Sequence, residues 1–82
     1  MTLPLILYST AGCHLCEQAE ALLGGAGLRA GRDYRLQDIA LDASLVERYG
    51  IRIPVLQRAS AELDWPFDAP RLRRFLDGGG AG

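Results

Sequence analysis

The two cysteines of this 82-residue chain, Cys13 and Cys16, lie where an apolar segment gives way to a helix-forming one. Residues 3–7 are apolar, as expected of a buried strand, and residues 17–23 are rich in strong helix formers. Side chains three residues apart share a helix face, with Cβ atoms roughly 5–6 Å apart, so the two thiols can form a disulfide with little backbone movement. A helix N-terminus also favours a thiolate, Cys13 more than Cys16 because it is nearer the helix end. The segment therefore predicts a redox-active dithiol.

The net charge of −1 gives the chain no electrostatic reason to bind nucleic acid or an acidic membrane surface. The apolar start is too short for the core of a signal peptide, and no segment approaches the length that spans a membrane. We therefore expect a cytoplasmic protein, in a compartment where ordinary thiols stay reduced. Two cysteines in that setting indicate redox chemistry, metal binding or chance rather than a disulfide framework.

Hydrophobic periodicity and turn residues predict seven elements in the order β-α-β-α-β-β-α. The leading βαβ unit requires parallel first and second strands, and a following hairpin adds an antiparallel pair. The chain is thus expected to form one α/β domain, a mixed four-stranded sheet flanked by three helices, over residues 1–77, with a flexible Gly-rich tail at 78–82. The expected strands are 3–8, 33–39, 51–57 and 62–65, the last of them at an edge, and the expected helices start near residues 13, 43 and 69.

Helical spacing also predicts which side chains point into the core. Asp42 and Asp68 are expected to cap the second and third helices, and glycines at 24–25 and 50 to end the first and second. The expected inward-facing residues are Leu15, Ala19, Leu22 and Leu23 in the first helix, Leu45, Val46 and Tyr49 in the second, and Leu72, Phe75 and Leu76 in the third.

The Cys-x-x-Cys after the first strand, the order of elements and a proline opening the third strand, Pro54, resemble the thioredoxin fold. The small size, without an extra N-terminal strand and helix, is more similar to a glutaredoxin. Residues 8–16, 45–56 and 64–76 resemble the short bacterial glutaredoxin-like proteins. The resemblance covers nearly the whole chain up to about residue 77.

The resemblance implies a role for several residues of the site. Cys13 is expected to attack the substrate disulfide, and Cys16 to resolve the mixed disulfide. Pro54 matches a proline that follows a cis peptide bond beside the dithiol, where the backbone of Ile53 would pair with an extended substrate chain or glutathione. Gly12 is expected to keep the approach to Cys13 open.

The sequence departs from the usual glutaredoxin pattern at several points. His14 and Leu15 stand where Pro-Tyr is usual, residues 52–53 are Arg-Ile rather than Thr-Val, and no lysine precedes the dithiol. The Gly-Gly-x-Asp-Asp glutathione signature is absent from residues 64–68. His14 is expected to lower the pKa of the Cys13 thiol below its free value of about 8.5 when its imidazole is protonated. Asp68 is the predicted acceptor for a ligand amine.

These features predict a thiol-disulfide oxidoreductase that reduces protein or glutathione mixed disulfides. We expect a monomer with no tightly bound cofactor. Its internal disulfide would be reopened by glutathione or by a reductase. The alternative is a non-enzymatic carrier in which two chains share an iron-sulfur cluster ligated by Cys13. A zinc site is disfavoured because zinc takes four ligands and His14 lies badly between the cysteines. A third possible function is that of a redox-inert interaction domain. The arginines at 71, 73 and 74 form either a solvated helix face or a docking patch for an acidic partner.

Overall fold

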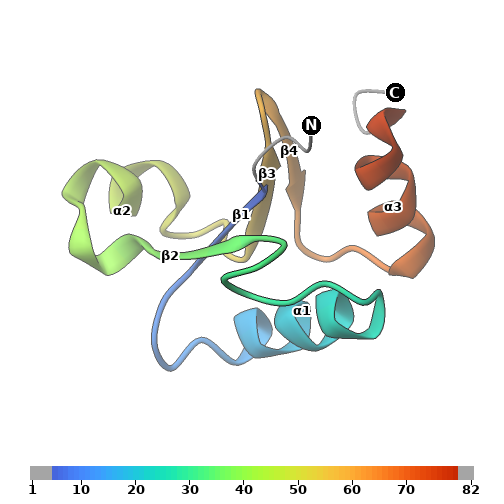
Figure 1. Cartoon of the computed structure of the whole chain (residues 1–82). Coiled ribbons are helices and arrows are strands. Elements are labelled where there is room, and N and C mark those ends of the chain that lie inside the picture. The colour runs from blue at the N-terminus through green and yellow to red at the C-terminus, as the bar shows by residue number, and fades with distance from the viewer. Residues whose placement is uncertain (1–4, 80–82) are drawn as a thin grey trace.

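The computed structural model describes residues 5–79, and its elements follow the predicted order (Figure 1). The expected beginning of the first strand at residues 3–4 and the end of the Gly-rich tail at 80–82 lie outside the described residues. The elements are β1 (Leu5–Ser9), α1 (His14–Gly25), β2 (Arg35–Asp38), the 3₁₀ turn η1 (Ile39–Leu41), α2 (Ala43–Tyr49), β3 (Val55–Arg58), β4 (Ala61–Asp64), α3 (Ala69–Arg74) and the final helical turn η2 (Phe75–Gly79).

The four strands form one mixed sheet in the order β2-β1-β3-β4. β1 runs parallel to β2 and antiparallel to β3, and β3 pairs with β4 as an antiparallel hairpin. The predicted parallel pair, the hairpin and the edge position of the last strand are confirmed. Leu7 on the central strand lies opposite Leu36 on one side and Leu56 on the other, so apolar positions line up across the sheet.

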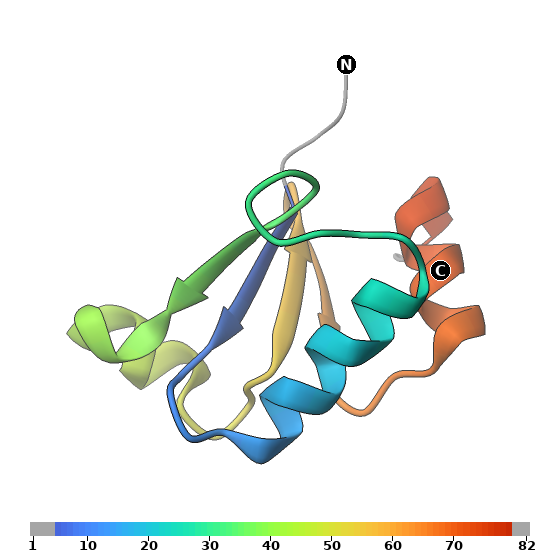
Figure 2. The same ribbon diagram turned by 60° about the horizontal axis from the view of Figure 1, so that its bottom comes forward.

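Helices cover both faces of the sheet, because the strands between them alternate apolar side chains up and down. Leu5 and Leu7 point to the face that α1 and α3 cover, while Ile6 and Tyr8 point to the face that α2 covers (Figures 1 and 2). The larger core cluster adds Ala19, Leu23, Tyr34, Leu56, Leu63, Phe67, Leu72 and Phe75, and the smaller adds Ile39, Tyr49 and Val55.

Side chains cap each of the three α-helices. Asp42 accepts a hydrogen bond from the Ser44 N–H at 2.8 Å, and Asp68 accepts one from the Arg71 N–H at 3.0 Å. Both predicted aspartate caps are therefore confirmed. α1 is capped by a sulfur instead, that of Cys13, which places the dithiol at the start of this helix.

The predicted inner face of α1 is confirmed at Ala19 and Leu23 and wrong at Leu15. Cys16, Ala19 and Leu23 are its buried residues, while Leu15 is 46% exposed and Leu22 only partly buried. The spacing of three and then four residues makes 16, 19 and 23 one stripe of a helix, and position 15 lies about 100° to its side. The pattern of apolar residues predicted Leu15 in place of Cys16, because it did not count the cysteine as a core residue. Cys16 nevertheless packs as one.

Three other expectations from the pattern are also wrong. Val46 is 46% exposed, and Tyr49 is the one buried residue of α2. The third strand begins at Val55 rather than at residue 51, and Ile51 is fully exposed in the turn that precedes it. The second strand is likewise shorter than expected at both ends, with Ile39 passing into η1.

A half-buried ionic cluster joins the end of α2 to the outer strand β4. The Arg52 guanidinium contacts Glu62 at 2.7 Å and Asp64 at 2.8 Å, and it lies over the Tyr49 ring, 5.2 Å from the centroid. The Tyr49 hydroxyl donates to Glu62 at 2.7 Å, and its ring stacks on Tyr8. Burial and then Glu62 raise the pKa of Tyr49 to about 12, and hydrogen bonds from Arg52 and Tyr49 lower the pKa of Glu62.

We expect Arg52→Ala to lower the free energy of unfolding by about 1 kcal/mol at about pH 7, because Glu62 loses its cation while remaining half-buried. A carboxyl whose pKa falls on folding contributes stability above its ordinary pKa near 4.5 and loses that contribution as the pH drops below it. The variant should therefore lose less stability than the wild type between about pH 6 and about pH 3 in urea unfolding. Arg35→Ala, at an exposed residue with no ion pair in the described part of the chain, is the control. Equal pH dependence in wild type and Arg52→Ala would contradict this account.

Candidate functional site

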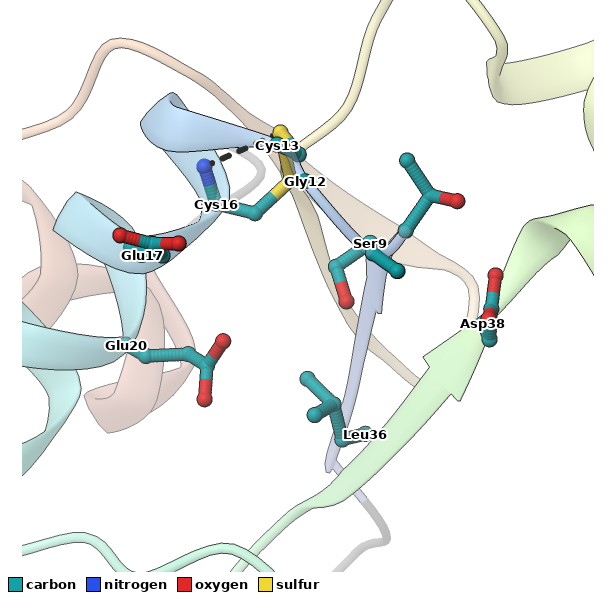
Figure 3. Close-up of a pocket in the computed structure, with 10 residues that line it drawn as sticks. Ser9, Gly12, Cys13, Cys16, Glu17, Glu20, Leu36 and Asp38 are labelled. Carbon is teal, nitrogen blue, oxygen red and sulfur yellow. Dashed lines mark hydrogen bonds between the residues drawn. A yellow bond between two sulfur atoms is a disulfide. The ribbon is translucent and has the colours of Figure 1, made fainter.

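Cys13 and Cys16 form a disulfide at the N-terminus of α1, with their Cα atoms 5.2 Å apart (Figure 3). Cys13 is the N-cap residue, and the backbone N–H of Cys16 donates to its Sγ at 3.1 Å. Cys16 is only 2% exposed, whereas Cys13 is partly exposed. An incoming sulfur can therefore reach Cys13, and the same N–H is placed to stabilise a thiolate there after reduction.

The residues on either side of Cys13 leave its approach open. Gly12 has a φ of +78°, a conformation that favours glycine, and a Cβ at this position would meet nothing within 4 Å. The turn is closed by the N–H of Cys13, which donates to the Thr10 carbonyl at 3.3 Å. His14 is exposed at the first position of α1, and its effect on the Cys13 thiol stays a prediction.

The predicted cis bond between Ile53 and Pro54 is confirmed, and Pro54 is buried just before β3. The N–H of Ile53 donates to the Tyr49 carbonyl at 3.0 Å. Pairing of Ile53 with a substrate chain would therefore use its carbonyl oxygen and not its N–H. A second cis bond precedes Pro66, which nothing in the sequence pattern had indicated.

Asp68 lies exposed at the start of α3, where one of its carboxylate oxygens already accepts the Arg71 N–H. Neither Asp68 nor the Ile53–Pro54 segment lines the pocket beside the disulfide. Of the predicted site residues, the structure brings Gly12, Cys13 and Cys16 together in that pocket.

The pocket has a volume of about 320 Å³ and lies between the start of α1 and the ends of β1 and β2 (Figure 3). It exists because α1 packs over β1 and leaves the edge strand β2 partly uncovered, so that Leu36 is 43% exposed. Besides the segment 9–13 and Cys16, the pocket is lined by Glu17 and Glu20 from α1 and by Leu36 and Asp38 from β2.

Sequence reasoning missed the side chains of this pocket other than those of the dithiol segment. Ser9 and Asp38 are register partners at the carboxyl ends of the parallel strands β1 and β2, and Ser9 shares the α1 face with Leu5 and Leu7. Glu17 and Glu20 are three residues apart on α1, on one side of the helix. The parallel pairing of the first two strands was predicted, so the signal lay in combining it with the helix spacing.

Glu20 affects its surroundings beyond the pocket. Burial raises the pKa of Tyr34, and the negative charge of Glu20 raises it further. The carboxyl of Glu20 lies on the partly buried side of α1 and points into the space that Leu36 faces from β2 (Figure 3).

Residues 5–79 contain no group of three or more histidine, cysteine, aspartate or glutamate side chains arranged to hold a metal ion. None of the helices over the same residues combines the length and apolar character that a membrane span requires.

A βαβ unit followed by a β-hairpin and a helix, with a dithiol at the first helix and a cis-proline before the third strand, defines a protein of the thioredoxin fold. The model of the glutaredoxin-like domain family matches residues 4–77. The chain is 48% identical to the Northeast Structural Genomics target protein XcR50 from X. campestris, whose X-ray structure superposes with a TM-score of 0.79 over 90% of this chain and 96% of that one. The solution structure of the same target gives a TM-score of 0.78, covering 90% and 92% of the two chains.

No curated protein matches the chain. With its family model matching nearly the whole length, the chain belongs to the glutaredoxin-like domain family. The family, the fold and the Cys13–Cys16 disulfide together support a redox thiol function.

Proposed function

We propose that the protein is a thiol-disulfide oxidoreductase that reduces disulfides through Cys13 and Cys16. The observation that carries this proposal is the asymmetry of the pair at the start of α1. The partly exposed sulfur of Cys13 accepts an N–H at 3.1 Å, while Cys16 is buried behind it. One cysteine is thus placed to meet a substrate, and the other can meet only Cys13.

The reaction begins with the reduced dithiol. The Cys13 thiolate attacks one sulfur of the substrate disulfide, the substrate S–S bond breaks, and the leaving thiolate takes up a proton. Cys16 then loses its proton and attacks the Cys13 sulfur of the mixed disulfide, which releases the second substrate thiol and closes the Cys13–Cys16 disulfide. Two electrons and two protons pass from the dithiol to the substrate.

A further thiol must reduce the Cys13–Cys16 disulfide after each cycle. Glutathione, acting twice, or the dithiol of a reductase would supply the two electrons. Such a cycle fits a reducing compartment, so we place the protein in the cytoplasm and propose that it acts as a monomer without a tightly bound cofactor. Ile53, Pro54 and Asp68 are proposed to contact the substrate chain, and His14 to favour the Cys13 thiolate.

The proposal is tested by single-turnover reduction of the neutral bis(2-hydroxyethyl) disulfide by the pre-reduced protein, freed of reductant. We expect a rate at least about tenfold above that of free cysteine at about pH 7, because the helix N-terminus raises the thiolate fraction. Mass spectrometry should then show the Cys13–Cys16 disulfide in the product. A rate equal to that of free cysteine, with the chain binding a coloured iron-sulfur cluster when supplied anaerobically with iron and sulfide, would overturn the proposal in favour of a cluster carrier.

A further inference from the structure

The pocket beside the disulfide is lined by three carboxylates and by no basic side chain. Glu17 and Glu20 reach it from α1, and Asp38 reaches it from the end of β2. Over residues 5–79 none of these three carboxylates forms a salt bridge, although the same residues do form salt bridges between arginines and other acids. Asp38 accepts one hydrogen bond from the Ala40 N–H at 2.9 Å. The pocket therefore carries negative charge that the described residues leave uncompensated.

Ser9 gives a second and independent indication of a ligand. Ser9 is only 5% exposed, and its hydroxyl forms no hydrogen bond with other residues of 5–79, while the oxygen atom itself is not fully enclosed. In Figure 3 its oxygen points into the same space as Glu20 and Leu36. Because no neighbouring residue bonds it, this accessible hydroxyl is placed to bond a group that enters the pocket.

We propose that this pocket binds a positively charged group of the disulfide substrate, an ammonium or guanidinium that lies a few bonds from the attacked sulfur. The inference rests on the function proposed above and names the class of substrate at the same site. The cation would lie in the field of the carboxylates of Glu17, Glu20 and Asp38 and would donate to the Ser9 hydroxyl. Leu36 would contact the aliphatic part that connects the cation to the sulfur.

The position of the carboxylates relative to Cys13 explains why the pocket would favour the reduction of cationic disulfides and not only attract cations to the surface. Glu17 lies one helical turn after Cys13, and Glu20 one turn further. A cation bound between them and Asp38 holds the neighbouring disulfide beside the dithiol, which raises the rate of attack. The same carboxylates disfavour a disulfide of net negative charge such as oxidised glutathione, each half of which carries two carboxylates and one ammonium.

The preferred substrates are therefore disulfides flanked by basic residues in a protein chain, or small disulfides that carry amines. Cystamine is a matched small probe, since it differs from bis(2-hydroxyethyl) disulfide by an ammonium in place of each hydroxyl. The charge preference is defined as the single-turnover rate with cystamine divided by the rate with the neutral disulfide. Differences in leaving-group chemistry and in Cys13 reactivity cancel when this ratio is compared between variants.

We expect the triple variant Glu17→Gln, Glu20→Gln, Asp38→Asn to lower the charge preference about tenfold at low salt. Raising the salt from about 0.02 M to about 0.5 M should lower the wild-type preference and change that of the variant much less. Glu47→Gln, which removes an exposed acid of α2 outside the pocket, is the matched control and should keep the wild-type preference. A short peptide disulfide flanked by arginines, compared with one flanked by glutamines, shows whether a protein chain can supply the cation.

The outcomes separate this inference from the proposed function. Reduction of both small disulfides, with a preference that the triple variant and Glu47→Gln share with the wild type, would overturn the cationic pocket and leave the oxidoreductase intact. Failure to reduce either disulfide would overturn the oxidoreductase itself. A preference for cystamine without any preference for the arginine-flanked peptide would assign the pocket to small amine-bearing disulfides.

Discussion

Cys13→Ser is expected to lower the rate of disulfide reduction by at least about a thousandfold, to the background of the assay, because a serine hydroxyl does not ionise near neutral pH and cannot form the mixed disulfide. The buried Cys16 does not replace it. With only 2% of its surface exposed, its sulfur is out of reach of a substrate. The loss should persist at high substrate concentration, since the missing step is chemical.

Cys16→Ser should behave differently from Cys13→Ser although it removes the same functional group. The first attack remains, so a mixed disulfide between Cys13 and the substrate should form and accumulate in place of the product. Mass spectrometry after mixing with bis(2-hydroxyethyl) disulfide measures this adduct directly. Reduction activity in Cys13→Ser, or an adduct on Cys16 in that variant, would contradict the assigned roles.

The fold could be predicted because the signals that specify it are local and strong. The apolar run of β1 and the glycines that end α1 and α2 each act on a few neighbouring residues. The dithiol at Cys13 and Cys16 was likewise predicted from a local signal, since its geometry follows from a helix that begins at a known residue. The cis bond before Pro54 followed from the resemblance to the thioredoxin fold and not from any local signal.

The acidic pocket could not be predicted in the same way because it depends on contacts between distant segments. Glu17 and Asp38 come together only when β2 lies beside β1 in one particular register, and a shift of one residue would turn Asp38 to the opposite face. The Arg52 cluster has the same origin. The two carboxylates that Arg52 contacts lie ten and twelve residues later in the chain, on β4. The pattern of charged residues in a sequence does not specify the register in which two strands pair.

The burial of Cys16 illustrates how site and core depend on one another. The apolar stripe of α1 runs through Cys16, Ala19 and Leu23, so the resolving cysteine is held by the packing that joins α1 to the sheet. Cys13 lies at the end of that stripe, where the helix meets solvent. The functional asymmetry of the dithiol is therefore a consequence of where the helix begins relative to its buried face.

The second prediction with a large expected effect concerns the hydrophobic core on the face of the sheet that α1 and α3 cover. Phe75 is 1% exposed and belongs to the larger core cluster, together with Leu72 from α3 and Leu23 from α1. We expect Phe75→Ala to lower the free energy of unfolding by about 3–5 kcal/mol, because the lost burial of the ring adds to the cost of the cavity that it leaves. A domain of this size has a total of about 5–15 kcal/mol, so the variant should be close to unfolding near room temperature.

Urea unfolding of the reduced protein, followed by fluorescence of the single tryptophan, measures this change. Trp65 packs edge-on against Phe67 at 5.1 Å between ring centroids and so reports on the same cluster. The carbonyl of Phe75 accepts a hydrogen bond from Arg58 at 2.9 Å, and this contact uses the backbone, which the substitution leaves in place. Ile51→Ala removes a fully exposed side chain and should change the free energy of unfolding by less than about 0.5 kcal/mol. Equal shifts in the two variants would show that the last helical turn is not part of the core that holds α1 and its dithiol on the sheet.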